Sequence, residues 1–217
     1  MLRSASLAAV SVLALSSLSL ADVWVVGNTG TGNDFYSVAD AMGSGSISDG
    51  DTLRILSGQY GSFDTGNTVV RIEPGNSPGI IDVYGNMSVR HNSTVNFELS
   101  GLNSGLSVGD PQFDQFIVTG HVFFAGDIEI SLFGGFIPSL GNSFALIQAG
   151  QSLSFTGIVT ILPVLADGLS WDISVNPGVS SDSGLSGGYS LVASVVPAPS
   201  AVALIGMAGL IVRRRRA

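Results

Sequence analysis

Short apolar runs separated by glycine, serine and asparagine make up most of the chain between residues 22 and 195. In residues 127–132 the alternation is strict, with Ile128, Ile130 and Leu132 at every second position and polar residues between them. This period of two predicts a strand with one buried and one solvent-facing side. Neighbouring runs are only a few residues apart, which leaves no room for crossover helices, so the pattern predicts an all-β body.

The expected strands are short and are bounded by turn residues. They span residues 23–26, 53–55, 68–73, 79–84, 87–91, 94–99, 116–119, 122–125, 127–132, 143–148, 157–162, 169–175 and 188–195. One short helix is expected over residues 36–42, with Asp34 as its N-cap and Val38, Ala39 and Met42 on one side.

Two stretches resemble right-handed parallel β-helices. A strand, a short helix and the segment GDTLRIL–GQY follow one another in residues 23–60, as at the entrance of pectin-lyase-like β-helices, where a helix covers the first coil. Residues 114–150 resemble the C-terminal coils of autotransporter-like β-helices. The resemblance implies a short right-handed parallel β-helix (a β-solenoid) with an N-terminal capping helix, and we expect Trp171 to cover the core. A β-sandwich is the alternative: antiparallel hairpins would replace the parallel coils, and the residues leave the strand direction open.

Residues 1–21 have the layout of a secretory signal peptide. Arg3 gives a positive start, residues 7–15 are apolar, and Ser19 and Ala21 are the small residues expected at positions −3 and −1 of a cleavage site. We therefore expect cleavage between Ala21 and Asp22, and we expect the β body to occupy residues 22–195.

The remaining residues, 196–217, fall into three pieces: a Pro-x-Pro motif, an apolar run and a block of arginines. The motif consists of Val196, Pro197, Ala198 and Pro199. The run contains Ala201, Leu204, Ile205, Leu210 and Val212, and the block is Arg213, Arg214, Arg215 and Arg216. Proline keeps the motif out of a helix. A helix over residues 200–212 would rise about 20 Å, against a hydrocarbon core of about 30 Å. The arginines favour a cytoplasmic end, which places the rest of the chain outside.

This tail resembles the PEP-CTERM sorting signal of bacteria, whose pattern is Val-Pro-Glu-Pro, an apolar helix and an arginine cluster. Ala198 stands where the family has glutamate. The resemblance implies that export machinery and an exosortase-like sorting enzyme are the partners. It also implies that a transmembrane helix tethers the chain in transit, before the mature protein is released or attached at the cell surface. An ordinary C-terminal membrane anchor is the alternative, so cleavage or retention of the tail stays open.

Without its two ends, the chain is strongly acidic. The body holds three arginines (Arg54, Arg71 and Arg90) and all sixteen acidic residues, for a formal charge of −13. Such a charge excludes nucleic acid as a partner. The sequence also contains neither lysine nor cysteine, which excludes a disulfide framework and thiolate chemistry.

Few residues of the body could carry catalysis or hold a metal. His91 and His121 are the only histidines and lack carboxylates at ligand spacing, so we expect no zinc site. No Gly-x-Ser-x-Gly elbow marks a serine nucleophile. A polysaccharide lyase would need an arginine beside clustered acids, but ion pairs or solvated turns are the simpler interpretation of Arg54, Arg71 and Arg90. We expect no cofactor, although structural Ca²⁺ is considered at the oxygen-rich loops 33–34, 49–51 and 110–114.

The sequence thus predicts an exported cell-surface or extracellular-matrix protein with a structural or interaction role and no enzyme activity. The alternative is a carbohydrate-binding or polysaccharide-degrading β-helix module, with an extracellular polysaccharide as its partner. A sugar-binding face needs a row of exposed aromatic residues, and Tyr60, Tyr84 and Tyr189 are the candidates.

Overall fold

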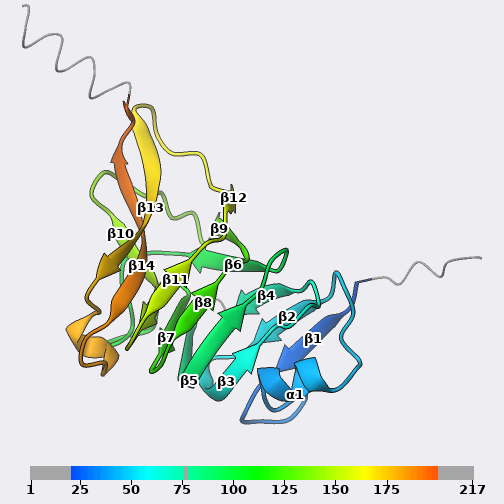
Figure 1. Ribbon diagram of the computed structural model, residues 1–217. Coiled ribbons are helices and arrows are strands. Elements are labelled where there is room, and N and C mark those ends of the chain that lie inside the picture. Colours follow the sequence, from blue (N-terminus) through cyan, green and yellow to red (C-terminus); the bar gives the residue numbers. More distant parts are fainter. Residues whose placement is uncertain (1–20, 76–77, 200–217) are drawn as a thin grey trace, which may run out of the picture.

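The computed structural model describes residues 21–75 and 78–199, and the regular secondary structure in this part of the chain is almost entirely β-strand. Its strands form two sheets that enclose one hydrophobic core, with β1 at one end of the molecule and β13 and β14 at the other (Figure 1). The expected all-β class is therefore confirmed.

The first sheet is entirely parallel. Its order is β1-β2-β4-β6-β9-β12, so each strand pairs with the sheet's next strand along the chain. The strands are β1 (Val23–Val26), β2 (Thr52–Ile55), β4 (Arg71–Pro74), β6 (Thr94–Leu99), β9 (Asp127–Leu132) and β12 (Val159–Ile161).

The second sheet is mixed. It contains β3 (Gly58–Asp64), β5 (Ile80–Val89), β7 (Gln115–Val118), β8 (Val122–Phe124), β10 (Ser143–Ala149), β11 (Leu153–Phe155), β13 (Leu169–Pro177) and β14 (Tyr189–Pro197). Strands β3, β5, β7, β8, β10 and β11 pair in parallel, and β14 pairs antiparallel with both β10 and β13. From β2 to β11 the chain passes from the first sheet to the second and back, so each sheet grows by adding the next pass of the chain.

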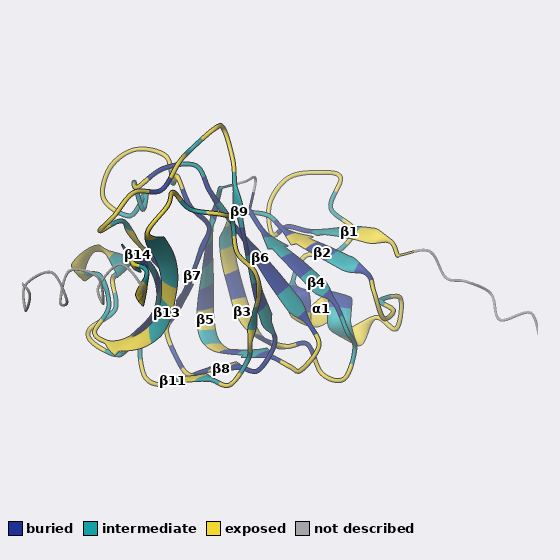
Figure 2. Ribbon diagram, turned by 90° about the horizontal axis from the view of Figure 1, so that it is seen from above, coloured by how far each residue is buried: buried dark blue, intermediate teal, exposed yellow. Residues whose placement is uncertain are grey.

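The strand register stacks apolar side chains in columns inside the molecule. Leu53 pairs with Ile72, which pairs with Val95, which pairs with Ile128, and all four are fully buried. On the facing sheet, the positions in register are Ile81, Phe116, Ile147 and Leu191, and these are also fully buried. Figure 2 shows the buried residues along the strands and the exposed ones mostly in the loops. Burial of these columns is the main force that holds the two sheets together.

Glycines form the corners where the chain crosses between the sheets. A Cβ atom on Gly157 would lie 1.8 Å from the carbonyl oxygen of Gly126, and one on Gly126 would lie 2.4 Å from that of Ser93. The same contact recurs at another corner, where Gly120 lies against Gly85. Backbones of successive passes therefore touch at the corners, which only glycine permits without displacement of the neighbouring chain.

At the N-terminal end a single short helix, α1 (Val38–Gly43), packs against β3. The helix lies where it was expected, but Asp34 is not its N-cap. The Ser37 hydroxyl accepts the Asp40 N–H at 3.0 Å, because Ser37 directly precedes the first turn. Asp34 instead accepts the N–H of Val25 at 2.8 Å and ties the preceding loop to β1.

At the other end, the antiparallel pair β13 and β14 completes the second sheet, and a 3₁₀ turn (Ser181–Ser183) lies in the connection between them. Trp171 of β13 packs on Phe144, with ring centroids 6.1 Å apart, and its indole N–H donates to the Pro163 carbonyl at 3.0 Å. Trp171 therefore covers the core at this end, as expected.

Several strands differ from those expected. No strand was predicted for the segments that form β3 and β11, and β4 begins at Arg71 instead of residue 68. The two strands expected at residues 79–84 and 87–91 merge into one continuous strand, β5 (Ile80–Val89). Gly85 remains bonded there, because its N–H donates to the Thr119 hydroxyl and its carbonyl accepts from Gly120. The last strand, β14, continues through Val196 and Pro197, which pair with Ser170 and Leu169.

Candidate functional site

The motif expected to sort the protein begins inside the last strand. Val196 and Pro197 end β14, and the Ala198 N–H donates to the Gly168 carbonyl at 2.8 Å, while Pro199 is exposed. Val196 and Pro197 are extended rather than helical, in keeping with the restriction that proline imposes. Pro199 is helical, so the expectation does not hold for the whole motif. The first part of the motif is thus fastened to the end of the β-structure.

The rest of the expected tail lies outside the described residues. This applies to the apolar positions Ala201, Leu204, Ile205, Leu210 and Val212 and to the block Arg213–Arg216. Within residues 21–75 and 78–199, no helix has the length and apolar character needed to cross a membrane.

The expected signal cleavage site lies where the described residues begin. Ala21 and Asp22 are exposed, whereas the Asp22 carbonyl already accepts the N–H of Thr52 at 2.8 Å. The Asp22 N–H also donates to the carboxylate of Asp51 at 2.9 Å. The structure therefore places the first residue after the expected cut in direct contact with β2 and the turn before it, and residues 1–20 lie outside the described part.

The three arginines of the body are used in ion pairs. Arg54 pairs with Glu73 at 3.2 Å, Arg71 contacts Glu129 at 2.5 Å and Glu73 at 3.3 Å, and Arg90 donates to Asp64 at 2.9 Å. Arg71 on β4 thereby reaches across β6 to β9. Of the two simpler interpretations, ion pairs or solvated turns, the structure shows ion pairs, and these join neighbouring passes of the chain.

The pKa values of Asp64 and Arg71 are shifted towards their charged forms. The hydrogen bond from Arg90 lowers the pKa of Asp64. Partial burial would lower the pKa of Arg71, but the hydrogen bonds to Glu129 and Glu73 outweigh this and raise it. An arginine held in this way cannot serve as a proton acceptor.

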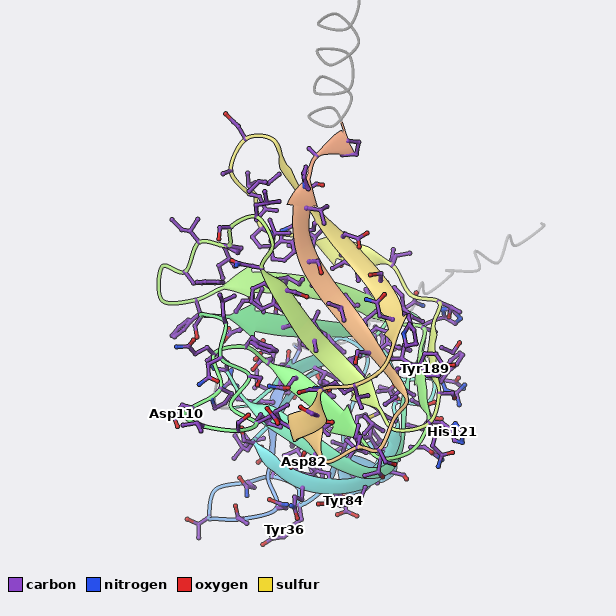
Figure 3. The ribbon with its side chains drawn as sticks, turned by 90° about the vertical axis from the view of Figure 1, so that its left-hand side faces the viewer. Tyr36, Asp82, Tyr84, Asp110, His121 and Tyr189 are labelled. Atoms are coloured by element: carbon purple, nitrogen blue, oxygen red, sulfur yellow. The ribbon has the colours of Figure 1, made fainter. Side chains whose placement is uncertain are left out.

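The three candidate tyrosines do not form a row. Tyr60 is buried, and its hydroxyl donates to the Leu56 carbonyl at 2.7 Å. Tyr189 pairs in register with the buried Ala149 and so lies on the inner side of the sheet. Tyr84 directly follows the inward-facing Val83 and so lies on the outer side. Figure 3 shows Tyr84 and Tyr189 on different strands, with the exposed Tyr36 on the loop before α1. The structure therefore does not bring together the aromatic platform that a sugar-binding face requires.

Most carboxylates of the oxygen-rich loops considered for Ca²⁺ accept backbone hydrogen bonds. Asp34 accepts from Val25, Asp49 from Val69, and Asp51 from Asp22 and Ser48. Among the described residues, no group of three acidic or histidine side chains converges at a spacing that could hold a metal ion. His121 is exposed and its Nδ1 lies 2.8 Å from the Ser152 hydroxyl.

Surface recesses among the described residues include the following two. A shallow depression of about 620 Å³ lies between α1 and the outer side of β3 and β5, lined by Met42, Ser62, Asp64 and Asn86 among others. A smaller recess of about 150 Å³ lies beside the 3₁₀ turn and contains Asp82, whose pKa is raised by burial. The described residues that line these recesses include no histidine or arginine.

Asp114, which the sequence suggested only as an oxygen ligand in the loop 110–114, is a buried carboxylate. Asp114, directly before β7, is fully buried and accepts the Gly79 N–H at 2.6 Å and the Glu98 N–H at 2.8 Å. Burial raises its pKa to about 7, although the two backbone donors act in the opposite direction. The sequence signal was weak, because Asp-Gln before an apolar run also occurs in exposed turns. Asp114 fastens the loop before β5 to β6, which is a structural role.

We predict that the protein loses stability as the pH rises from 4 to 7 because of Asp114. Its folded-state pKa lies above the unfolded value of 3.8, so its stabilising contribution is complete below that value and is lost as the pH approaches 7. The loss should be about 3 kcal/mol over this range. Urea unfolding at several pH values should show this slope in the unmodified protein and a flatter profile in Asp114→Asn. The control Asp110→Asn changes an exposed carboxylate on the same loop and should keep the slope; equal slopes in all three proteins would contradict the prediction.

Comparison with known proteins returns no match to a protein-family model, to a curated protein or to a solved structure. The functional argument therefore depends on the residues and contacts described above.

Proposed function

We propose that the body is a short right-handed parallel β-helix closed by α1 at one end and by the β13–β14 hairpin at the other. The parallel pairings, the alternation of the chain between two sheets and the corner glycines support this assignment. Right-handed connection of parallel strands is the strongly preferred form. The ends need covers because a bare end of such a stack exposes core side chains and unpaired backbone.

We propose that the protein is exported and has a structural or interaction role at the cell surface or in the extracellular matrix. Its signal peptide ends at Ala21, and its tail from Val196 is read by an exosortase-like sorting enzyme while a membrane helix tethers the chain. The observation that carries this proposal is that the proposed motif starts at the end of β14. This strand of the closing hairpin pairs with β10 of the stack on one side and with β13 on the other. The motif is thus held at the surface of the body, with exposed Pro199 leading into the tail.

We propose no catalysis for this protein. The arginines of the body, which a polysaccharide lyase would need as bases, are engaged by Glu73, Glu129 and Asp64. We expect the purified protein to leave acidic polysaccharides such as polygalacturonate and alginate intact, with or without added Ca²⁺, as measured by the absorbance of unsaturated products. Turnover that disappears in Arg71→Gln, while Asp110→Asn at an exposed position of the body leaves it unchanged, would contradict the proposal and favour the degrading alternative.

A further inference from the structure

Asp51 is a buried carboxylate whose partners, among the described residues, are all uncharged N–H groups. Its side chain is 2% exposed. Oδ2 accepts the indole N–H of Trp24 and the Ser48 N–H, both at 2.9 Å, and Oδ1 accepts the Asp22 N–H at 2.9 Å. A buried charge is costly unless it is paired, and the three arginines of the body are paired with other acids.

The donor to Oδ1 is the one backbone nitrogen that signal cleavage would change. Hydrolysis of the Ala21–Asp22 bond adds water across it, so that Ala21 gains a carboxylate and the Asp22 nitrogen becomes an amine that is protonated near neutral pH. We propose that the α-ammonium group of mature Asp22 forms an ion pair with the buried carboxylate of Asp51, so that removal of the signal peptide completes and stabilises the N-terminal end of the fold. This inference rests on the proposed cleavage before Asp22.

The geometry favours this role over that of an ordinary backbone hydrogen bond. The amine nitrogen would stay where the Asp22 nitrogen lies, because the Asp22 carbonyl is held by Thr52 and β1 begins at the next residue. Hydrogen bonds from Ser48, Asp22 and Trp24 lower the pKa of Asp51 in spite of its burial, so the carboxylate is charged at neutral pH. Its contacts also join β1 to the turn before β2, through Trp24 and Ser48. An ion pair at Asp22 would therefore secure the first strand of the stack against fraying.

The absence of lysine makes a clean test possible, because the α-amine is then the only primary amine in the mature chain. The chain from Asp22 to Ala217 is produced in detergent from a fusion whose protease leaves Asp22 first. It is compared before and after acetylation of the α-amine, which keeps the N–H donor but removes the charge. We expect acetylation to lower the melting temperature by at least about 3 °C, the shift that a loss of about 1 kcal/mol causes in a protein of this size.

Two variants identify the partner of the amine. In Asp51→Asn, acetylation should no longer change the melting temperature, and at neutral pH the amine should react faster with the acylating reagent than in the unmodified chain. Asp49→Asn is the matched control, since Asp49 lies in the same turn but accepts from Val69, and its response to acetylation should equal that of the unmodified chain. If Asp51→Asn does not fold, acetylation of the unmodified chain still decides the point.

The exported protein is also isolated from its own cells and its first residue determined by mass spectrometry. A first residue of Asp22 together with the effect of acetylation supports the inference. A first residue of Asp22 with no effect of acetylation overturns the ion pair and leaves the proposed export intact. Any other first residue overturns both the cleavage site and the ion pair.

Discussion

Replacement of Phe124 by alanine should lower the free energy of unfolding by about 3–5 kcal/mol, whereas the same change at its neighbour Phe123 should cost about 1 kcal/mol or less. Both residues lie on β8, but Phe124 is fully buried and packs on Phe155, with ring centroids 5.8 Å apart. Phe123 is 36% exposed, and the guanidinium of Arg90 lies 5.4 Å from its ring centroid. Comparison of the two alanine variants therefore measures the contribution of the inner side of the sheet to stability separately from that of the outer side. Urea unfolding followed by tryptophan fluorescence measures both variants.

A large loss at Phe124 would arise from the cavity that alanine leaves between two successive passes of the chain, because β8 and β11 pair in register there. Similar losses at Phe123 and Phe124 would contradict the placement of the core between the two sheets. Phe123→Leu keeps apolar area without the aromatic ring and serves as a control for the contact with Arg90.

Removal of residues 200–217 should abolish delivery of the protein to the cell surface. The deletion should start at Ser200, because Val196 and Pro197 pair with β13 and the Ala198 N–H binds Gly168. Protease added to intact producing cells should then digest the full-length protein and leave the truncated one, which would remain behind the cell envelope. The reason is that the truncated chain lacks the apolar run and the arginines that hold it at the membrane for sorting.

Two controls separate sorting from folding. The truncated protein should keep the melting temperature of the full-length body, since its last described contacts are retained. A second variant that replaces Arg213–Arg216 by glutamine keeps the length of the tail and should also fail to reach the surface. Unchanged surface delivery of the truncated protein would refute the sorting proposal.

The sequence predicted the class of the fold through its period of two. Strict alternation in residues 127–132 anticipated β9, where Ile128 and Ile130 are buried and the residues between them face outward. The ion pairs of the body arginines were anticipated as a class, because a body with so few cations places them among many acids. The acidic partners were not predicted. Arg71 and Glu129 are distant in the sequence and lie close together because β6 alone separates their strands, β4 and β9, in the sheet.

The sequence contains a repeat that corresponds to the successive passes of the chain, in the spacing of its corner glycines. Gly120 and Gly150 at one corner, and Gly126 and Gly157 at another, recur at intervals of about 30 residues. Loops of different length interrupt the period, and the many other glycines in the chain conceal it. Only the close backbone approach at these positions shows that the glycines mark corners.

The residues alone determined an acidic, cysteine-free chain of short alternating strands, because the spacing of apolar side chains and the count of charges depend only on their order. The tertiary structure decided strand direction, with parallel pairing through most of both sheets and antiparallel pairing at β14, because alternation is the same for either direction. It also decided which carboxylates are buried: Asp51 and Asp114 look like ordinary turn residues until strands distant in the sequence enclose them. Burial is a property of the packed chain, so no local pattern could assign it.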